Sequence, residues 1–224
     1  MKTLVFSDTH LTDKFDPELF DYIAELVESA DQVVINGDFW DGYLTTFDAF
    51  CNSQWNKLFP LLKKKKAVYI FGNHDQQEQM DERCNLFSDT QTMMLSFKSG
   101  KKNIVIEHGH RISPSENQLF PFLKPSLIRP FFAAATLFYE SYLPLKRSFD
   151  FLYRNTTCVM HQKRITSYIK KHRKKDTIYI VGHTHIFKFD NSINFISCAL
   201  TEAGENSCVI IEDGNVSPLF YKYD

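Results

Sequence analysis

The sequence predicts an α/β protein in which two β-sheets are packed between layers of helices, an αββα sandwich. Short β-branched and apolar runs recur along the chain, as is typical of strands buried on both faces. Helix signals separate the first of these runs, and short strands with a turn signal close the chain. The five apolar runs are Leu4–Phe6, Val33–Ile35, Val68–Phe71, Ile104–Ile106 and Ile178–Val181.

Two helices are expected in the first half of the chain. Asp16, Pro17 and Glu18 begin the first, which extends to about Ser29, because proline fits the first helical turn and acidic side chains are favourable there. The second is expected over Thr45–Leu62. It ends in four consecutive lysines, whose charge complements the carboxyl end of the helix dipole.

Short antiparallel strands are expected at the end of the chain. Asp213 and Gly214 form a typical two-residue hairpin turn between the last two of them. The expected strands are Ile186–Asp190, Ile193–Ser197, Cys208–Glu212 and Val216–Tyr221.

A short polar cluster follows each of the five apolar runs. Six of the eight histidines fall in these clusters, together with carboxylates and one carboxamide. Such nitrogen and oxygen donors are those that a pair of borderline divalent metals needs. The clusters are Ser7-Asp8-Thr9-His10, Gly37-Asp38-Phe39-Trp40-Asp41, Gly72-Asn73-His74-Asp75, His108-Gly109-His110 and Gly182-His183-Thr184-His185.

The spacing within the clusters favours convergent side chains. Asp8 and His10 are two residues apart, as are His183 and His185, and alternate residues of an extended segment project to the same side. Taken singly, each motif is also typical of a surface loop, a turn or a helix cap. The five together, each at the end of a predicted strand, indicate a dinuclear metal site.

This ordered set of motifs resembles the calcineurin-like metallophosphoesterase superfamily, from Asp8 to His185. The resemblance implies an αββα fold and a two-metal site in which Asp38 bridges the ions. It implies that one metal is held by Asp8, His10, Asp38 and His185, and the other by Asp38, Asn73, His108 and His183. Two such ions lower the pKa of a shared water, so that hydroxide can attack phosphorus near neutral pH.

Four further residues of the clusters are candidates for supporting roles. His74 is not an implied ligand, so its imidazole is free to stabilise developing charge or to protonate the leaving oxygen, and Asp75 is the nearest candidate to orient it. Asp41 either fixes a ligand histidine from behind or is a solvated residue at a helix start. His110 is a candidate for substrate contact, for support of a ligand or for a polar loop residue.

Composition bounds the setting of this site. A chain of 224 residues with 43% hydrophobic content suits a single catalytic domain over residues 1–224. Five cysteines without a Cys-x-x-Cys pair indicate no disulfide framework and a reducing cytoplasm. No apolar stretch reaches the ~18 residues of a membrane span, and no cleavable signal is expected at the start. Manganese is the expected metal, and Fe, Zn and Co also suit these donors.

Residues 113–175 are predicted to form an inserted helical cap. The segment carries twelve Lys and Arg against three acidic residues, a net charge of +9, while the rest of the chain carries −10. Ten aromatic residues lie between positions 119 and 153, and prolines punctuate the segment into several short helices. As plain structure, such aromatics form a small satellite core. As function, they suit a substrate with acyl chains and phosphate, or peripheral contact with the anionic inner membrane surface.

The position of this basic insertion, directly after the His-Gly-His cluster, resembles the lid of bacterial UDP-2,3-diacylglucosamine pyrophosphohydrolases. The chain departs from that branch at His74, where the branch typically has Arg, and at His110, where it has Asp. The resemblance implies a phosphoester or pyrophosphate of a lipid-linked nucleotide as the substrate. Candidate substrate-binding residues in the cap are Arg129, Lys146, Arg147 and Arg154.

The sequence is also compatible with three other functions. A nucleic-acid phosphodiesterase would use the basic insertion to bind phosphates, although no nucleic-acid motif is present. A general small-molecule phosphatase would need only the metals. A non-catalytic interaction scaffold would be free to lose ligands, yet all seven ligand positions are filled.

Overall fold

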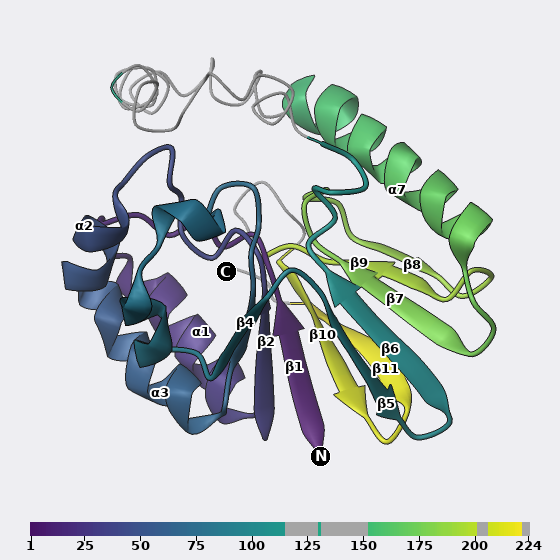
Figure 1. Cartoon of the computed structure of the whole chain (residues 1–224), viewed down its shortest axis with the longest axis horizontal. Helices are drawn as coiled ribbons and strands as arrows, with labels where there is room; N and C mark the ends of the chain where they lie inside the picture. The colour runs from purple at the N-terminus through teal and green to yellow at the C-terminus, as the bar shows by residue number, and fades with distance from the viewer. Residues whose placement is uncertain (115–129, 131–151, 201–205, 221–224) are drawn as a thin grey trace.

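Two β-sheets lie face to face, and helices cover their outer faces (Figure 1). The structure is a computed structural model that describes residues 1–114, 130, 152–200 and 206–220. The helices α1 to α3 cover the first sheet, and α7 covers the second (Figure 1). The predicted αββα sandwich is confirmed.

The first sheet has six strands in the order β11-β10-β1-β2-β3-β4. Its strands β1 to β4 are parallel, whereas β10 pairs antiparallel with β1 and with β11. They are β1 (Lys2–Phe6), β2 (Gln32–Asn36), β3 (Val68–Ile70), β4 (Thr90–Thr92), β10 (Ser207–Glu212) and β11 (Asn215–Phe220).

The second sheet has five strands in the order β5-β6-β7-β9-β8. Its central strands β6, β7 and β9 are parallel, and the two edge strands are antiparallel to their neighbours. They are β5 (Leu95–Ser99), β6 (Lys102–Glu107), β7 (Thr177–Val181), β8 (Lys188–Asp190) and β9 (Phe195–Ser197).

The side chains of β1 alternate between two hydrophobic cores. Successive side chains of a strand point to opposite faces, so Leu4 and Phe6 pack toward the helices and Val5 packs toward the second sheet. All three are fully buried. A third core, which includes Ile165 and Ile169, lies between α7 (Val159–His172) and the second sheet.

The first predicted helix is present as α1 (Pro17–Glu28), and the Asp16 side chain caps it by accepting from the backbone N–H groups of Glu18 and Leu19. The prediction of one helix over Thr45–Leu62 is wrong. The chain forms α2 (Phe47–Asn52), a 3-10 turn η1 (Gln54–Leu58) and α3 (Phe59–Lys64).

Ser53 causes the first of these breaks. Its backbone is extended, with φ −77° and ψ 174°, and its hydroxyl lies 2.7 Å from the Phe50 carbonyl oxygen. The break turns Trp55 inward, where its indole N–H donates to the Lys14 carbonyl at 2.9 Å. The buried indole of the residue that follows the first break thus has a hydrogen-bond partner.

The C-terminal strands follow the prediction with shifted bounds. Strands β10 and β11 are joined by Asp213 and Gly214, both with positive φ (49° and 82°), as a type I′ hairpin requires. Strands β4 and β5 were not predicted from the sequence. Strand β5 carries a period-2 signal, because Leu95 and Phe97 pack against the core between the sheets.

Part of the predicted cap is described. It contains α7 and the π-helical turn η4 (Arg154–Cys158), and the short helices expected over residues 115–129 and 131–151 lie outside the described residues. No helix in the described ranges is long and apolar enough to cross a membrane.

The aromatic core under the first sheet sets a stability prediction. Phe50 is fully buried and packs its ring against Phe39 and Phe59. Phe50→Ala should lower the free energy of unfolding by about 3–5 kcal/mol, because it opens a cavity among rigid rings. Phe189, which is 41% exposed on β8, is the control, and Phe189→Ala should cost about 0.5 kcal/mol or less. If urea denaturation shows that both variants lose the same free energy of unfolding, this assignment of the core is wrong.

Candidate metal centre

All seven predicted metal ligands lie in loops that follow strand ends. Because β1 to β3 are parallel, and β6 is parallel to β7, the carboxyl ends of the strands within each sheet meet at the same edge. Asp8 and His10 follow β1, Asp38 follows β2, Asn73 follows β3, His108 follows β6, and His183 and His185 follow β7. The structure brings all seven together.

The backbone of these loops is held in an unusual conformation. Asp8, His10, Asp38, His183 and His185 have positive φ values of 57°, 47°, 53°, 66° and 52°. A non-glycine residue rarely adopts this left-handed region, and such strain persists only where the surroundings enforce it. Its concentration in five predicted ligands indicates a functional site.

Two glycines allow the loops to approach one another. A Cβ on Gly72 would lie 2.0 Å from Asp38 Oδ1, and a Cβ on Gly37 would lie 2.5 Å from His108 Nδ1. Gly37 also has φ +81°, which disfavours a side chain at that position. Glycine is therefore required at both positions.

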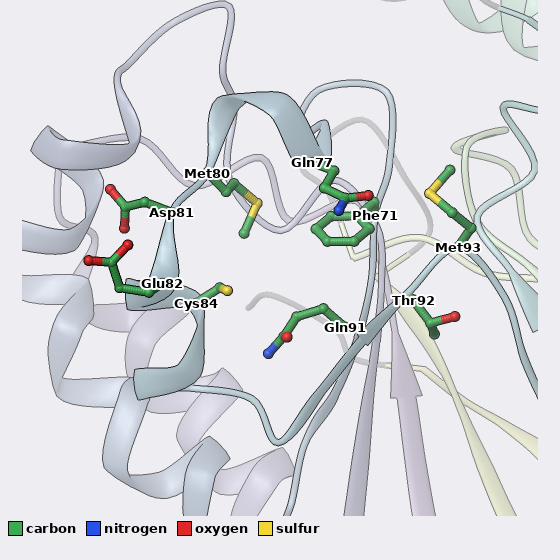
Figure 2. A pocket seen from close by; sticks show the side chains of 9 residues that line it. All are labelled: Phe71, Gln77, Met80, Asp81, Glu82, Cys84, Gln91, Thr92 and Met93. Atoms are coloured by element: carbon green, nitrogen blue, oxygen red, sulfur yellow. The ribbon is translucent and has the colours of Figure 1, made fainter.

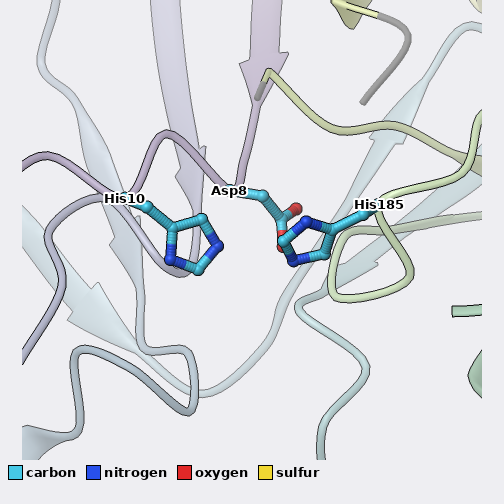
Figure 3. A group of neighbouring side chains, drawn as sticks. All are labelled: Asp8, His10 and His185. Atoms are coloured by element: carbon cyan, nitrogen blue, oxygen red, sulfur yellow. The ribbon is translucent and has the colours of Figure 1, made fainter. Parts of the chain in front are cut away.

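The first donor group consists of Asp8, His10 and His185, whose ligand atoms lie within 4.8 Å of one another. Figure 3 shows the two imidazoles reaching toward the Asp8 carboxylate. His185 Nε2 lies 3.5 Å from Asp8 Oδ1. The backbone N–H of His183 donates to the same carboxylate, at 3.0 Å to Oδ1, so Asp8 is fixed in place.

The second donor group consists of Asp38, His108 and His183, all buried, with ligand atoms again within 4.8 Å. His108 Nε2 lies 3.1 Å from Asp38 Oδ2 and 3.2 Å from Asn73 Oδ1. Asp38 Oδ2 also lies 3.9 Å from His10 Nε2 of the first group. Asp38 therefore faces both groups.

Two buried atoms at this junction indicate that the residues fit a metal. Asp38 Oδ2 and His10 Nε2 take part in no hydrogen bond of the described structure. Among the described residues this buried carboxylate oxygen faces the His108 and His10 imidazoles, and a divalent cation between these atoms would lower the cost of burying it. The donors are imidazole nitrogens and carboxylate oxygens, which suit divalent transition metals.

The charges of the site point the same way. Burial alone would lower the pKa of His108, but the carboxylates of Asp38 and Asp8 outweigh it and raise the pKa to about 10. Burial dominates at His183 and His185, and both pKa values lie well below the ordinary range, so these imidazoles are neutral and ready to coordinate. The buried carboxylates thus draw positive charge into the site.

Asp41 joins a predicted ligand to the predicted catalytic histidine. Its Oδ2 lies 3.3 Å from His10 Nδ1 and 2.9 Å from His74 Nδ1, and its Oδ1 accepts from the backbone N–H groups of Tyr43 and Leu44. Asp41 is only 5% exposed, so the interpretation of a solvated residue is wrong. Burial would lower the pKa of His74, but Asp41 and Asp38 raise it to about 9.

The prediction that Asp75 orients His74 is wrong. Its carboxylate accepts from the backbone N–H groups of Asp38 (3.0 Å), Phe39 (2.7 Å) and Gly72 (2.6 Å), and from the Tyr69 hydroxyl. Burial, followed by the charge of Asp38, raises the pKa of Asp75 to about 7. Asp75 therefore ties the second and third loops together beneath the donors.

The remaining predicted site residues are His110 and the four cap residues. His110 is 5% exposed with its ring 5.5 Å from that of His108, so it lies inside the site region, and burial lowers its pKa to about 4. Arg154 is half-buried in η4. Its neighbour Tyr153 places its ring 6.3 Å from that of His185. The other cap candidates, Arg129, Lys146 and Arg147, lie outside the described residues.

Three residues beside the site were missed by the sequence analysis: Tyr153, Ser113 and His161. The hydroxyl of Ser113 lies 2.8 Å from His161 Nδ1, and its carbonyl lies 2.8 Å from His183 Nε2. None of the three belongs to a strand-end motif, so only tertiary packing could reveal them.

A separate pocket of about 390 Å³ lies beside β4 (Figure 2). Met80 and Cys84 line one side of it, and Gln91 and Thr92 of β4 line another. None of its lining residues is a predicted site residue, so we assign it no part in the chemistry.

The fold and the buried donor set define a metal-dependent phosphoesterase. A family model described as calcineurin-like phosphoesterase matches residues 1–187, and the chain belongs to this family. A search of curated proteins finds no match.

Several solved structures resemble the chain over almost its whole length. The phosphoesterase YfcE from E. coli is 12% identical, covers 98% of this chain and 99% of its own, and has a TM-score of 0.49. Wild-type Vps29 from Entamoeba histolytica, complexed with Zn²⁺, is 14% identical, with coverages of 98% and 97% and a TM-score of 0.47. An archaeal phosphodiesterase is 15% identical, with coverages of 99% and 100% and a TM-score of 0.46. Likeness at this level carries no information on substrate.

The raised pKa values lead to a prediction for metal binding. At pH 8 the metal-free protein should carry protons on His108 (pKa about 10) and His74 (pKa about 9). A histidine must be neutral to coordinate, and of these two only His108 is a predicted ligand, so metal binding should release about one proton per chain. Calorimetry of Mn²⁺ binding in two buffers of different ionisation enthalpy measures this number. A binding enthalpy that is the same in both buffers would contradict the charge state assigned to the site.

Proposed function

We propose that the protein binds two divalent ions, manganese being the first candidate, and hydrolyses a phosphoester or pyrophosphate bond of a lipid-linked nucleotide such as UDP-2,3-diacylglucosamine. The observation that carries the two-metal part is the position of Asp38, whose Oδ2 lies 3.1 Å from His108 Nε2 and 3.9 Å from His10 Nε2. A carboxylate between two imidazole-bearing groups suits a bridge between two cations.

When bound, the two ions supply a hydroxide at neutral pH and neutralise charge on the phosphoryl oxygens. Asp8, His10 and His185 would hold one ion, and Asn73, His108 and His183 the other, with Asp38 shared. The backbone N–H of His74 donates to Asp38 Oδ1 at 2.8 Å and leaves Oδ2 directed at both groups. The mixed donors without thiolate are compatible with manganese and with Fe, Zn or Co.

His74 is placed to supply a proton. Its Nδ1 lies 2.9 Å from Asp41 Oδ2, so Nε2 is left for the leaving-group oxygen. The side chain is 26% exposed, which leaves it open to substrate, and its ring is 4.5 Å from that of His10. Asp41 favours the protonated imidazole and fixes the direction of Nε2.

The substrate class rests on the part of the cap nearest the metals. Tyr153 places its ring 6.3 Å from that of His185, and both Tyr153 and its sequence neighbour Leu152 are exposed (40% and 58%), so this part of the cap offers apolar side chains to solvent. Arg154 adds a positive charge next to it. Apolar side chains mixed with cations suit acyl chains joined to phosphate, or an anionic membrane surface against which the protein would lie from the cytoplasmic side.

A substrate panel tests the proposal against its alternatives. Metal-loaded protein should hydrolyse UDP-2,3-diacylglucosamine faster than nucleotide diesters, phosphomonoesters or single-stranded DNA. Preference for DNA, with activity falling steeply as salt is added, would favour a nucleic-acid phosphodiesterase instead. Absence of hydrolysis of every substrate, with two metals bound, would favour a non-catalytic scaffold.

Two substitutions separate metal binding from proton transfer. Asp38→Ala should remove metal and abolish hydrolysis, because two cations would lose their shared carboxylate. His74→Asn should keep both ions but slow hydrolysis by roughly 10²–10⁴-fold, the usual loss for a general acid. Metal analysis and turnover of each purified variant check both statements. A His74→Asn variant that loses an ion would make His74 a ligand.

The described cap residues Leu152 and Arg154 lead to a further prediction. Leu152→Ser combined with Arg154→Gln should lower kcat/KM for the acylated substrate by roughly tenfold or more, since a lost apolar contact and a lost charge each weaken binding. Hydrolysis of a small nitrophenyl phosphodiester should be unchanged. Leu86, which is 54% exposed on η3 (Glu82–Leu86), provides the matched control Leu86→Ser. An equal loss on both substrates would argue against a substrate-binding role for this surface.

A further inference from the structure

The inner face of α7 is polar where it approaches the loops that follow β6 and β7, which carry His108 and His183. His161 is 4% exposed and Gln162 is 8% exposed, although an amphipathic helix normally buries apolar residues there. Farther along the same face Ile165 and Ile169 are apolar and pack against the second sheet. Buried polar side chains require partners, so His161 and Gln162 identify a specific contact.

His161 reaches the metal loops through Ser113. Its Nδ1 lies 2.8 Å from the hydroxyl of Ser113, which is fully buried. The backbone N–H of Ser113 donates to the Gly109 carbonyl at 3.0 Å, so Ser113 belongs to the loop that begins at His108. The ring of His161 also lies 4.6 Å from that of His183, at 62°.

Ser113 in turn determines which nitrogen of His183 faces the metal. The Ser113 carbonyl lies 2.8 Å from His183 Nε2, and a carbonyl can only accept, so Nε2 carries the proton. The lone pair is then on Nδ1. His108 has the opposite arrangement, because its Nδ1 donates to the Asn36 carbonyl at 2.8 Å and its Nε2 faces Asp38.

Gln162 makes an indirect connection to the loop that carries His183 and His185. Its Oε1 lies 3.1 Å from the hydroxyl of Ser197, which lies 2.7 Å from the hydroxyl of Thr184. Thr184 is fully buried between the ligands His183 and His185. Adjacent residues of α7 therefore reach this loop by two routes, since His161 packs against the His183 ring and Gln162 reaches Thr184 through Ser197.

From this geometry we propose that Ser113 and His161 are positioning residues for the second metal. Ser113 fixes the tautomer and direction of His183, and His161 holds Ser113 and packs against the His183 ring. The helix α7 then contributes to the geometry of the metal centre in addition to packing against the second sheet. The inference rests on the proposed two-metal function and adds a determinant of the affinity of one of the two sites.

Calorimetric titration of the metal-free full-length chain with Mn²⁺ tests it. In His161→Leu one of the two ions should bind roughly 10–100-fold more weakly, the usual effect of removing a partner behind a metal ligand. The other ion should keep its affinity. Ser113→Ala keeps the carbonyl but loses the hydroxyl, and should weaken the same ion. His161→Asn places a polar atom near the position of Nδ1 and should recover most of the loss.

Ile169→Ala is the matched control, because Ile169 lies on the same face of α7 and is 2% exposed. It should lower the melting temperature and leave both affinities unchanged. If His161→Leu and Ser113→Ala behave like this control, or His161→Asn recovers nothing, the inference is wrong. It is also wrong if both ions weaken equally. A wild-type chain that binds fewer than two ions would instead overturn the proposed function itself.

Discussion

The burial of the Asp38 carboxylate is the constraint on which the rest of the site depends. Asp38 is 1% exposed and lies where loops from both sheets meet, beside buried Asp8, Asp41 and Asp75. Burying several negative charges together is costly unless cations or hydrogen-bond donors surround them. Among the described residues, the ion pairs of Asp8, Asp38 and Asp41 are all with histidines, and metal ions would supply the stronger compensation.

This constraint explains the backbone around the site. Asp8, His10 and Asp38 keep positive φ because backbone hydrogen bonds hold their loops, including Asp8 N–H to Gly37 at 3.0 Å and His10 N–H to Asp38 at 2.9 Å. Asp75 accepts from three backbone N–H groups beneath them. The sandwich therefore stores strain at the strand ends, and the same contacts preorganise the donors for charge that arrives with the metals.

The seven donors could be predicted from the sequence because each lies in the polar cluster that follows an apolar strand, and parallel strands bring such positions together. The role of Asp75 could not be predicted in this way. Asp75 is next to His74 in the sequence, but its hydrogen-bond partners include Asp38, Phe39 and Tyr69. The helix break at Ser53 depends on the burial of Trp55 against Lys14, a contact between distant segments. His161 belongs to no motif, and only the packing of α7 reveals its part in the site.

The most direct test of this account is a crystal structure of the protein grown with Mn²⁺, with the ions located by anomalous scattering. Two peaks per chain are expected about 3.5–4 Å apart, as in other two-metal sites. One should lie among Asp8, His10 and His185 and the other among Asn73, His108 and His183, with Asp38 touching both. A single peak, or an ion held by His10, Asp41 and His74, would contradict it.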